Sequence, residues 1–148
     1  SHCAAAAATY GIRVRFDAPR ESVFIYADPL KLSQVLRNLL YNAINHTPED
    51  STITVSLKFK DDHTVRLSVT NPGTPISEED KKIIWERYQR SQHQSGRRMG
   101  TGIGLSIVST ILNAHGMKYG VDSDEKGTSF WFEITESGSN SLFNAAGV

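Results

Sequence analysis

Apolar and polar residues alternate along several short segments of the chain. Apolar side chains recur at every second position from Ile53 to Phe59 and from Val65 to Val69, on either side of an Asp61-Asp62-His63 turn. A two-residue period is typical of a strand with one face in a core, so these segments predict a hairpin. Further strands are expected over residues 11–16, 23–26, 117–121 and 128–134, with a turn at residues 124–127 between the last two.

Helical spacing marks three other segments. Asp28-Pro29 fits an N-cap followed by proline at the first helical position, and the apolar residues after it predict a long helix: Leu32, Val35, Leu36, Leu39, Leu40, Ala43 and Ile44. Ser77 to Asp80 is similar to a capping box and opens a helix with Ile83, Ile84 and Tyr88. Leu105 to Leu112 predict a third helix that ends at His115-Gly116. Together these elements favour an α+β fold, a two-layer sandwich whose mixed, mainly antiparallel sheet carries three helices on one face.

Composition restricts the class of protein. The 148 residues suit one domain, and 39% hydrophobic with 22% charged residues is typical of a globular protein. Sixteen basic residues balance sixteen acidic ones, which argues against nucleic acid as a partner. Cys3 has no second cysteine to pair with, and no apolar run reaches the ~18 residues of a membrane span. Residues 1–10 are expected to be disordered or not native, residues 11–136 to form the domain and residues 137–148 to be a flexible tail.

The polar side of the long predicted helix is a candidate cation site. Asn38, Asn42 and Asn45 fall with Lys31 and Gln34 in a narrow stripe opposite the leucines. A solvent-exposed face is the ordinary explanation, but such a face prefers Lys and Glu, and each Asn costs the helix roughly 0.5 kcal/mol relative to Ala. Neutral amide oxygens suit a hard cation that already carries phosphate charge.

Glycines mark two further candidate segments. Gly100, Gly102 and Gly104 precede the third helix, where glycine permits close backbone approach and a helix N-terminus offers free amides to phosphate. The spacing matches neither the Rossmann nor the Walker pattern, and a flexible hinge is the alternative explanation. The segment Asn71-Pro72-Gly73-Thr74-Pro75-Ile76 follows a strand and, taken alone, would be only a turn.

In this order the segments resemble the motifs of the catalytic ATP-binding domain of sensor histidine kinases, whose fold is shared with gyrase, the mismatch-repair ATPases and the ninety-kilodalton heat-shock chaperone. The matching segments are residues 28–47 (N box), 71–73 (start of the first glycine box), 85–90 (F box, with Trp85 in place of Phe), 100–105 (second glycine box) and 127–130 (closing Gly-Thr strand). The resemblance covers about residues 11 to 134. It implies the Bergerat-type ATP-binding fold.

The resemblance also implies a site for ATP and Mg²⁺. Asn42 would ligate the metal with Asn38 nearby, and His46 would lie near the ribose or the phosphates. Asn71 would face the adenine amino group, beside Gly73, Ile76 and Thr128 at the base. The other expected nucleotide-binding positions are Asn45, Arg97, Arg98, Gly100, Thr101, Gly102, Ile103, Gly104 and Leu105, with residues 91–99 as a lid.

Three positions depart from the family pattern. Asn71 replaces the usual Asp, which keeps an acceptor oxygen but loses the charge, so the bond to the adenine amino group should weaken by about 1 kcal/mol. Pro75 replaces the second glycine of that box and should stiffen the loop. Asn45 stands where many relatives place Lys, and the loss of that cation is offset by Arg97 or Arg98, or by Arg87 or Arg90, unless these arginines only increase solubility.

Asn38 bears on the reaction. Hydrolytic relatives carry at this position a Glu that activates water, and an amide cannot act as a general base. Transfer of the phosphoryl group to a supplied nucleophile is therefore favoured over hydrolysis.

The nucleophile is expected on another domain, because no histidine of this chain has the sequence context of a phosphoacceptor. The resemblance implies a helical-hairpin phosphoacceptor domain of the same kinase and a downstream response regulator. It also implies a cytoplasmic domain, monomeric by itself, of a membrane-anchored, homodimeric parent protein. A nucleotide-binding module without phosphotransfer and an anti-sigma-type serine kinase of the same fold are the alternatives.

Overall fold

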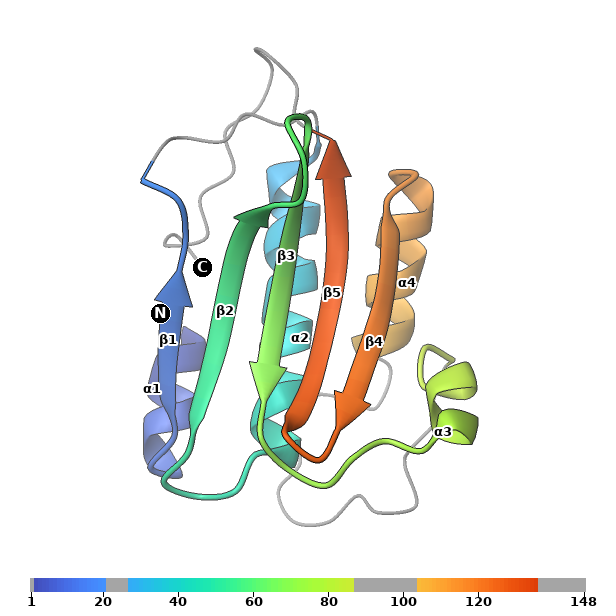
Figure 1. Ribbon diagram of the computed structural model, residues 1–148. Coiled ribbons are helices and arrows are strands. Elements are labelled where there is room, and N and C mark those ends of the chain that lie inside the picture. The colour runs from blue at the N-terminus through green and yellow to red at the C-terminus, as the bar shows by residue number, and fades with distance from the viewer. Residues whose placement is uncertain (1, 21–26, 87–103, 136–148) are drawn as a thin grey trace.

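The computed structural model describes residues 2–20, 27–86 and 104–135 of the chain. In these residues one five-stranded sheet has the strand order β1-β2-β3-β5-β4 (Figure 1). The strands are β1 (Arg13–Asp17), β2 (Thr52–Phe59), β3 (Thr64–Asn71), β4 (Lys118–Asp124) and β5 (Gly127–Thr135). The helices are α1 (His2–Thr9), α2 (Pro29–His46), α3 (Glu78–Ile83) and α4 (Gly104–Ala114).

The sheet is mixed. β1 pairs with β2 in parallel, whereas β2 with β3, β3 with β5, and β4 with β5 are antiparallel. The pairs β2–β3 and β4–β5 are the two predicted hairpins. In the turn between β2 and β3, Asp61 Oδ1 accepts hydrogen bonds from the amides of His63 and Thr64. The predicted fold class is confirmed.

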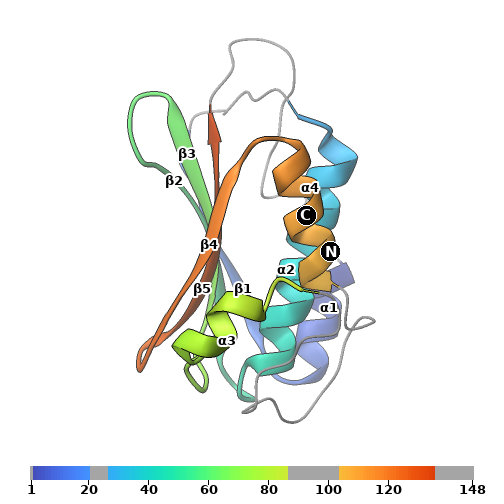
Figure 2. The ribbon, with the colours of Figure 1, turned by 90° about the vertical axis from the view of Figure 1, so that its right-hand side faces the viewer.

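Helices α1, α2 and α4 lie on one face of the sheet, and no helix of the described residues covers the other face (Figure 2). Buried side chains of the sheet line up in rows across the strands on the helical face, such as Val55, Val69 and Phe130. The predicted apolar stripe of α2 is fully buried against them. Asp28 caps this helix as predicted, because its carboxylate accepts a hydrogen bond from the amide of Leu30 at 2.9 Å.

The expectation of a disordered start over residues 1–10 is wrong, because His2–Thr9 form α1. Five consecutive alanines favour a helix, and their small side chains let it lie close to β1 and α2. Cys3 and Ala7 are buried in the core, and burial raises the pKa of the Cys3 thiol. The helix ends at Thr9, and the chain turns into β1 at Gly11, whose φ of 71° suits glycine.

Helix α3 is shorter than predicted and lies beyond the β4 edge of the sheet (Figure 1). Its Ser77 cap is confirmed, because the hydroxyl accepts a hydrogen bond from the Asp80 amide at 3.1 Å. The helix ends at Ile83, and Trp85 packs edge-on against Tyr119 and Phe130 with centroid distances of 4.9 and 5.4 Å. Tyr88, the expected strand over residues 23–26 and the expected tail over residues 137–148 lie outside the described residues. Among the residues described, no helix is long and apolar enough to cross a membrane.

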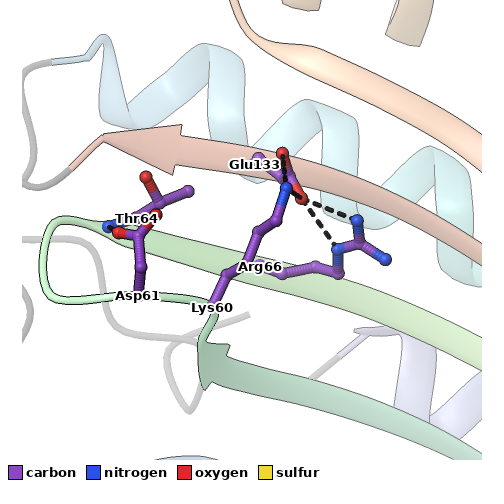
Figure 3. Close-up of polar contacts among 5 residues, drawn as sticks. All are labelled: Lys60, Asp61, Thr64, Arg66 and Glu133. Atoms are coloured by element: carbon purple, nitrogen blue, oxygen red, sulfur yellow. Dashed lines mark hydrogen bonds and ion pairs between the residues drawn. The ribbon is translucent and has the colours of Figure 1, made fainter.

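On the open face of the sheet, a charged cluster joins β3 and β5 to Lys60, the residue that follows β2. The Glu133 carboxylate accepts hydrogen bonds from Arg66 Nη2 at 2.6 Å and from Lys60 Nζ at 3.2 Å (Figure 3). The Arg66 guanidinium also lies over the Trp131 ring, 3.9 Å from its centroid. Burial raises the pKa of Glu133, but the hydrogen bonds and charges of Arg66 and Lys60 outweigh it, so that the net pKa is lowered.

We expect Glu133→Gln to lower the free energy of unfolding at pH 7 by about 1 kcal/mol, because the charge-assisted bonds become neutral. Since the folded-state pKa is lowered, the stabilisation by Glu133 is present above the ordinary glutamate pKa of 4.5 and is lost as the pH falls through the folded value. Urea unfolding of both proteins between pH 7 and pH 4 measures the gap. A gap that stays constant, or widens, as the pH falls would contradict this assignment.

Candidate functional site

The helical face of the sheet changes from apolar to polar at one row. Asn71, Thr128 and Ser123 lie opposite one another on β3, β5 and β4, next to the apolar row of Val69, Phe130 and Val121. Asn71 is only 3% exposed and Thr128 only 5% exposed. Buried polar side chains need hydrogen-bond partners, so a buried polar row at the end of a core indicates a site that binds a polar ligand.

The loop after β3 closes over this row and contacts the end of α2. Gly73 has a φ of 145°, and a Cβ atom there would lie 2.6 Å from the carbonyl oxygen of His46. No other residue type fits that approach without a shift of the backbone. On the other side of the loop, the Ile76 amide donates a hydrogen bond to Ser123 Oγ at 2.8 Å.

The amide of Asn71 has a fixed orientation. Its Nδ2 donates a hydrogen bond to the carbonyl oxygen of Pro72 at 2.7 Å. A flipped amide would place two carbonyl oxygens against each other, so the Oδ1 atom is held on the opposite side. Within the described residues that oxygen accepts no hydrogen bond, which leaves an acceptor available in the polar row.

The asparagine stripe of α2 meets the start of α4. A Cβ atom added to Gly104 would lie 3.7 Å from both Cβ and Cγ of Asn38. Asn38, Asn42, Asn45 and His46 are all half-buried, so the stripe is not the freely solvated face of the alternative explanation. From Asn38 to His46 the helix rises about 12 Å, which separates the α4 end of the stripe from the Gly73 end.

Two chain segments therefore contact opposite ends of one stretch of α2. The N-terminus of α4, where the first amides of a helix have no partner within the helix itself, lies at one end, and the polar row with its closing loop lies at the other. Neutral amide oxygens between them suit a cation that arrives with phosphate. In the described part of the chain, no group of three or more His, Cys, Asp or Glu side chains could hold a metal ion.

His46 is neutral near pH 7. Burial lowers the pKa of its imidazole below the ordinary value of 6.5. The side chain is therefore suited to give or accept a hydrogen bond, and less suited to act as a fixed positive charge for phosphate.

Some expected site residues cannot be placed, because they fall outside the described residues: Arg97, Arg98, Gly100, Thr101, Gly102, Ile103 and the lid over residues 91–99. Leu105 packs against the core at the start of α4, and Ile76 does so from the loop after β3. The structure brings Asn38 next to Gly104, and Gly73 next to His46 and Asn71.

Sequence reasoning missed Ser123, which bonds to both the loop and Thr128. The strand was expected to end at Val121, but β4 extends to Asp124. With the longer strand, Ser123 takes the place of an apolar residue in the alternation with Tyr119 and Val121, and that signal was available in the sequence.

Residues 27–138 match the family of histidine kinase-, DNA gyrase B- and HSP90-like ATPases, and the chain belongs to this family. Its relatives are sensor kinases. The chain is 40% identical over 121 residues to the sensor histidine kinase CusS of Escherichia coli K12, and 36% identical over 123 residues to the adaptive-response sensory kinase SasA of Nostoc sp. PCC 7120. These matches cover 81% and 83% of this chain, but only 25% of CusS and 30% of SasA.

Solved structures agree with the family. The catalytic domain of histidine kinase ThkA, in a nucleotide-free form, superposes with a TM-score of 0.75 at 32% identity, over 91% of this chain and 86% of that one. The mycobacterial sensor histidine kinase MprB has the same fold, with a TM-score of 0.78 at 21% identity and 93% of each chain covered. The chain is an ATP-binding domain of the type found in sensor histidine kinases.

Two glycines should respond differently to Ala, because only one is required by packing. At Gly104 a Cβ meets Asn38 at ordinary contact distance, so we expect Gly104→Ala to keep or raise the melting temperature while it weakens Mg²⁺-ATP binding. At Gly73 the positive φ and the His46 carbonyl should make Ala cost about 1–3 kcal/mol of stability. Thermal unfolding and calorimetric titration check both variants. Unchanged ATP affinity in a folded Gly104→Ala variant would contradict the expectation that phosphate binds at the α4 end.

His46 should make the fold sensitive to acid. Because its folded-state pKa is lowered, the unfolded state binds more protons near pH 6, and stability falls as the pH drops through the ordinary histidine range. His46→Gln removes this contribution. Between pH 8 and pH 5.5 we therefore expect the melting temperature of the wild type to fall more than that of the variant. A difference that does not depend on pH would show that the imidazole is not desolvated.

Proposed function

We propose that this domain binds Mg²⁺-ATP and donates the γ-phosphoryl group to a histidine on a separate helical-hairpin domain of a two-component sensor kinase. The bond from the γ-phosphorus to the bridging oxygen breaks, a bond from that phosphorus to the imidazole nitrogen forms, and ADP leaves. The histidine nitrogen loses its proton, so that charge and atoms balance.

One observation carries the proposal: the asparagine stripe of α2 lies between the start of α4 and the polar row of the sheet. The α4 end would hold the phosphates, and the polar row would hold the base. Asn42 lies one helical turn from Asn38 on the same side of α2, and we assign it to the metal. When bound, Mg²⁺ would neutralise phosphate charge as the phosphoryl group is transferred.

The residues at the base end fit adenine. Asn71 Oδ1, which accepts no hydrogen bond from the described residues, would accept one from the adenine amino group, so the replacement of Asp by Asn preserves the hydrogen bond although it removes the charge. Gly73 lets the loop close against α2, and the Ile76 side chain packs nearby at the edge of the core. These features support nucleotide binding despite the departure at Asn71.

Transfer is favoured over hydrolysis because the described side chain beside Gly104 is Asn38, an amide, where hydrolytic relatives carry Glu. The nucleophile would come from the acceptor domain of the parent kinase, and a response regulator would receive the phosphoryl group. ThkA has been solved in complex with a response regulator protein, TrrA, and this chain matches 36% of that ThkA chain at 32% identity with a TM-score of 0.71. We place this domain in the cytoplasm, in a dimeric parent protein anchored in a membrane.

We expect Asn42→Ala to weaken Mg²⁺-ATP about tenfold or more and to leave the affinity for metal-free adenosine nearly unchanged, because the lost amide serves the metal. Calorimetric titrations of both ligands measure the two constants. Asn113→Ala on the exposed end of α4 is the matched control, and it should bind both ligands like the wild type. Equal losses for the two ligands in Asn42→Ala would contradict the metal assignment.

Phosphotransfer itself is tested by adding radiolabelled ATP and a cognate helical-hairpin domain to the wild-type chain. Acid-labile label on the hairpin domain is the expected result, and acid-stable label would indicate the serine-kinase alternative. Binding of ATP with no transfer to any hairpin domain would favour a nucleotide-binding module without kinase activity.

A further inference from the structure

The polar stripe of α2 continues beyond the part that the proposed site uses. Gln34 and Lys31 belong to the same narrow stripe as Asn38, but they lie nearer the N-terminus of the helix. Measured along the helix axis, Gln34 lies about 6 Å beyond Asn38, and Lys31 lies about 10 Å beyond it. Both residues therefore lie past the α4 end of the site, on the side away from Gly73, and Lys31 is exposed there.

Gln34 carries an amide that no other described residue uses. The side chain is half-buried, and within the part of the chain that the structure describes its amide makes no hydrogen bond. A glutamine offers a carbonyl acceptor and an NH₂ donor on one side chain. The Gln34 amide is therefore available to a polar group that comes from outside the described residues.

Leu30 gives the same end of α2 an apolar surface. Its side chain is 81% exposed, whereas Phe16 and Phe59, the other large apolar side chains exposed among the described residues, are each 40% exposed. Leu30 stands four residues before Gln34, so the two side chains are neighbours on the surface of α2. An exposed leucine by itself needs no explanation, but this one lies next to the residues that lead to the phosphate end of the site.

The direction of phosphoryl transfer determines the side from which the acceptor approaches. In the proposed function the base lies at the Gly73 end of α2 and the phosphates lie at the Asn38 end. The γ-phosphate is the terminal group of the nucleotide, so it lies farthest from the base. The attacking atom and the leaving oxygen lie roughly in line through the γ-phosphorus. The acceptor therefore comes from the side opposite the base, where α2 presents Gln34, Lys31 and Leu30.

We propose that Leu30, Lys31 and Gln34 form the docking surface for the helical-hairpin phosphoacceptor domain, and that the Gln34 amide orients the acceptor imidazole. Leu30 packs against an apolar part of the hairpin. The Gln34 carbonyl oxygen accepts a hydrogen bond from the protonated ring nitrogen, which turns the lone pair of the other nitrogen toward the γ-phosphorus. That proton passes to water once the phosphorus–nitrogen bond has formed and ADP has left. The inference rests on the proposed function and adds to it the surface that receives the acceptor.

Two substitutions separate docking from orientation. Leu30→Asp removes the apolar contact, so we expect it to raise the KM for the hairpin domain about tenfold or more and to leave kcat nearly unchanged. Gln34→Met keeps the length and the helix propensity of the side chain but removes the amide, so we expect kcat to fall about tenfold with KM nearly unchanged. Neither variant should change the affinity for Mg²⁺-ATP, because the nucleotide lies nearer the C-terminus of α2.

Lys58→Asp is the matched control for Leu30→Asp. Lys58 lies opposite Arg66 on the open face of the sheet, and its side chain is 70% exposed. The substitution places the same carboxylate on a well-exposed surface that the acceptor does not approach. Its KM, its kcat and its affinity for Mg²⁺-ATP should equal those of the wild type.

The test measures the rate at which acid-labile label appears on the hairpin domain of the parent kinase as a function of hairpin concentration. The whole chain and its variants are used at saturating Mg²⁺-ATP, and calorimetric titrations give the affinity of each for Mg²⁺-ATP. A wild-type KM in Leu30→Asp would overturn the docking surface, and a wild-type kcat in Gln34→Met would overturn the role of the amide.

A loss of Mg²⁺-ATP affinity in either variant would also overturn the inference, because it would place that residue in the nucleotide site itself. If the wild type binds Mg²⁺-ATP but labels no hairpin domain, the proposed function fails and the inference fails with it, a result that the wild type alone gives. Should Leu30→Asp not fold, Leu30→Lys is measured under the same criteria.

Discussion

The approach of two chain segments to the C-terminal half of α2 is the constraint on which the site depends. At one end Gly73 lies so close to the His46 carbonyl that only a residue without a side chain fits. At the other end the first residue of α4 lies beside Asn38. Because the apolar face of α2 is fully buried in the core, the side chains of its polar stripe are held in fixed positions between these two contacts. Transfer of a phosphoryl group requires binding groups that are held in this way.

The sheet contributes to the site the polar row at which its apolar pattern ends. Rows of Val, Leu and Phe fill the helical face until the last row, in which Asn71, Thr128 and Ser123 replace them. Burying these groups lowers the stability of the isolated fold unless each finds a partner, and a purine base would supply partners in one specific pattern. The opposite face of the sheet carries a charged cluster around Glu133, which we connect with stability and not with ligand binding.

Much of this arrangement was predictable from sequence because period and caps are local signals. The strand alternation at Ile53–Phe59 and the Asp28 cap of α2 were predicted correctly. Helix α1 was missed because an alanine run has helix propensity but no apolar and polar faces to detect. Helix α3 ends at Ile83, and Trp85 two residues later contacts Tyr119 and Phe130, which are distant in the sequence. The break that Ser123 makes in the alternation of β4 is visible in the sequence, but its pairing with Thr128 depends on the cross-strand register. Such long-range pairings are set by tertiary structure and leave only weak local traces.

The most direct measurement replaces Mg²⁺ by paramagnetic Mn²⁺ in an ATP complex of the isotope-labelled chain and records the broadening of backbone amide signals by NMR. Broadening falls steeply with distance from the metal. A metal–triphosphate held between α2 and α4 predicts the strongest broadening at Asn38, Asn42 and Gly104, less at Asn71 and Thr128, and none at Trp131 or Glu133. Strong broadening on the open face of the sheet, with Asn42 and Gly104 unaffected, would contradict the account.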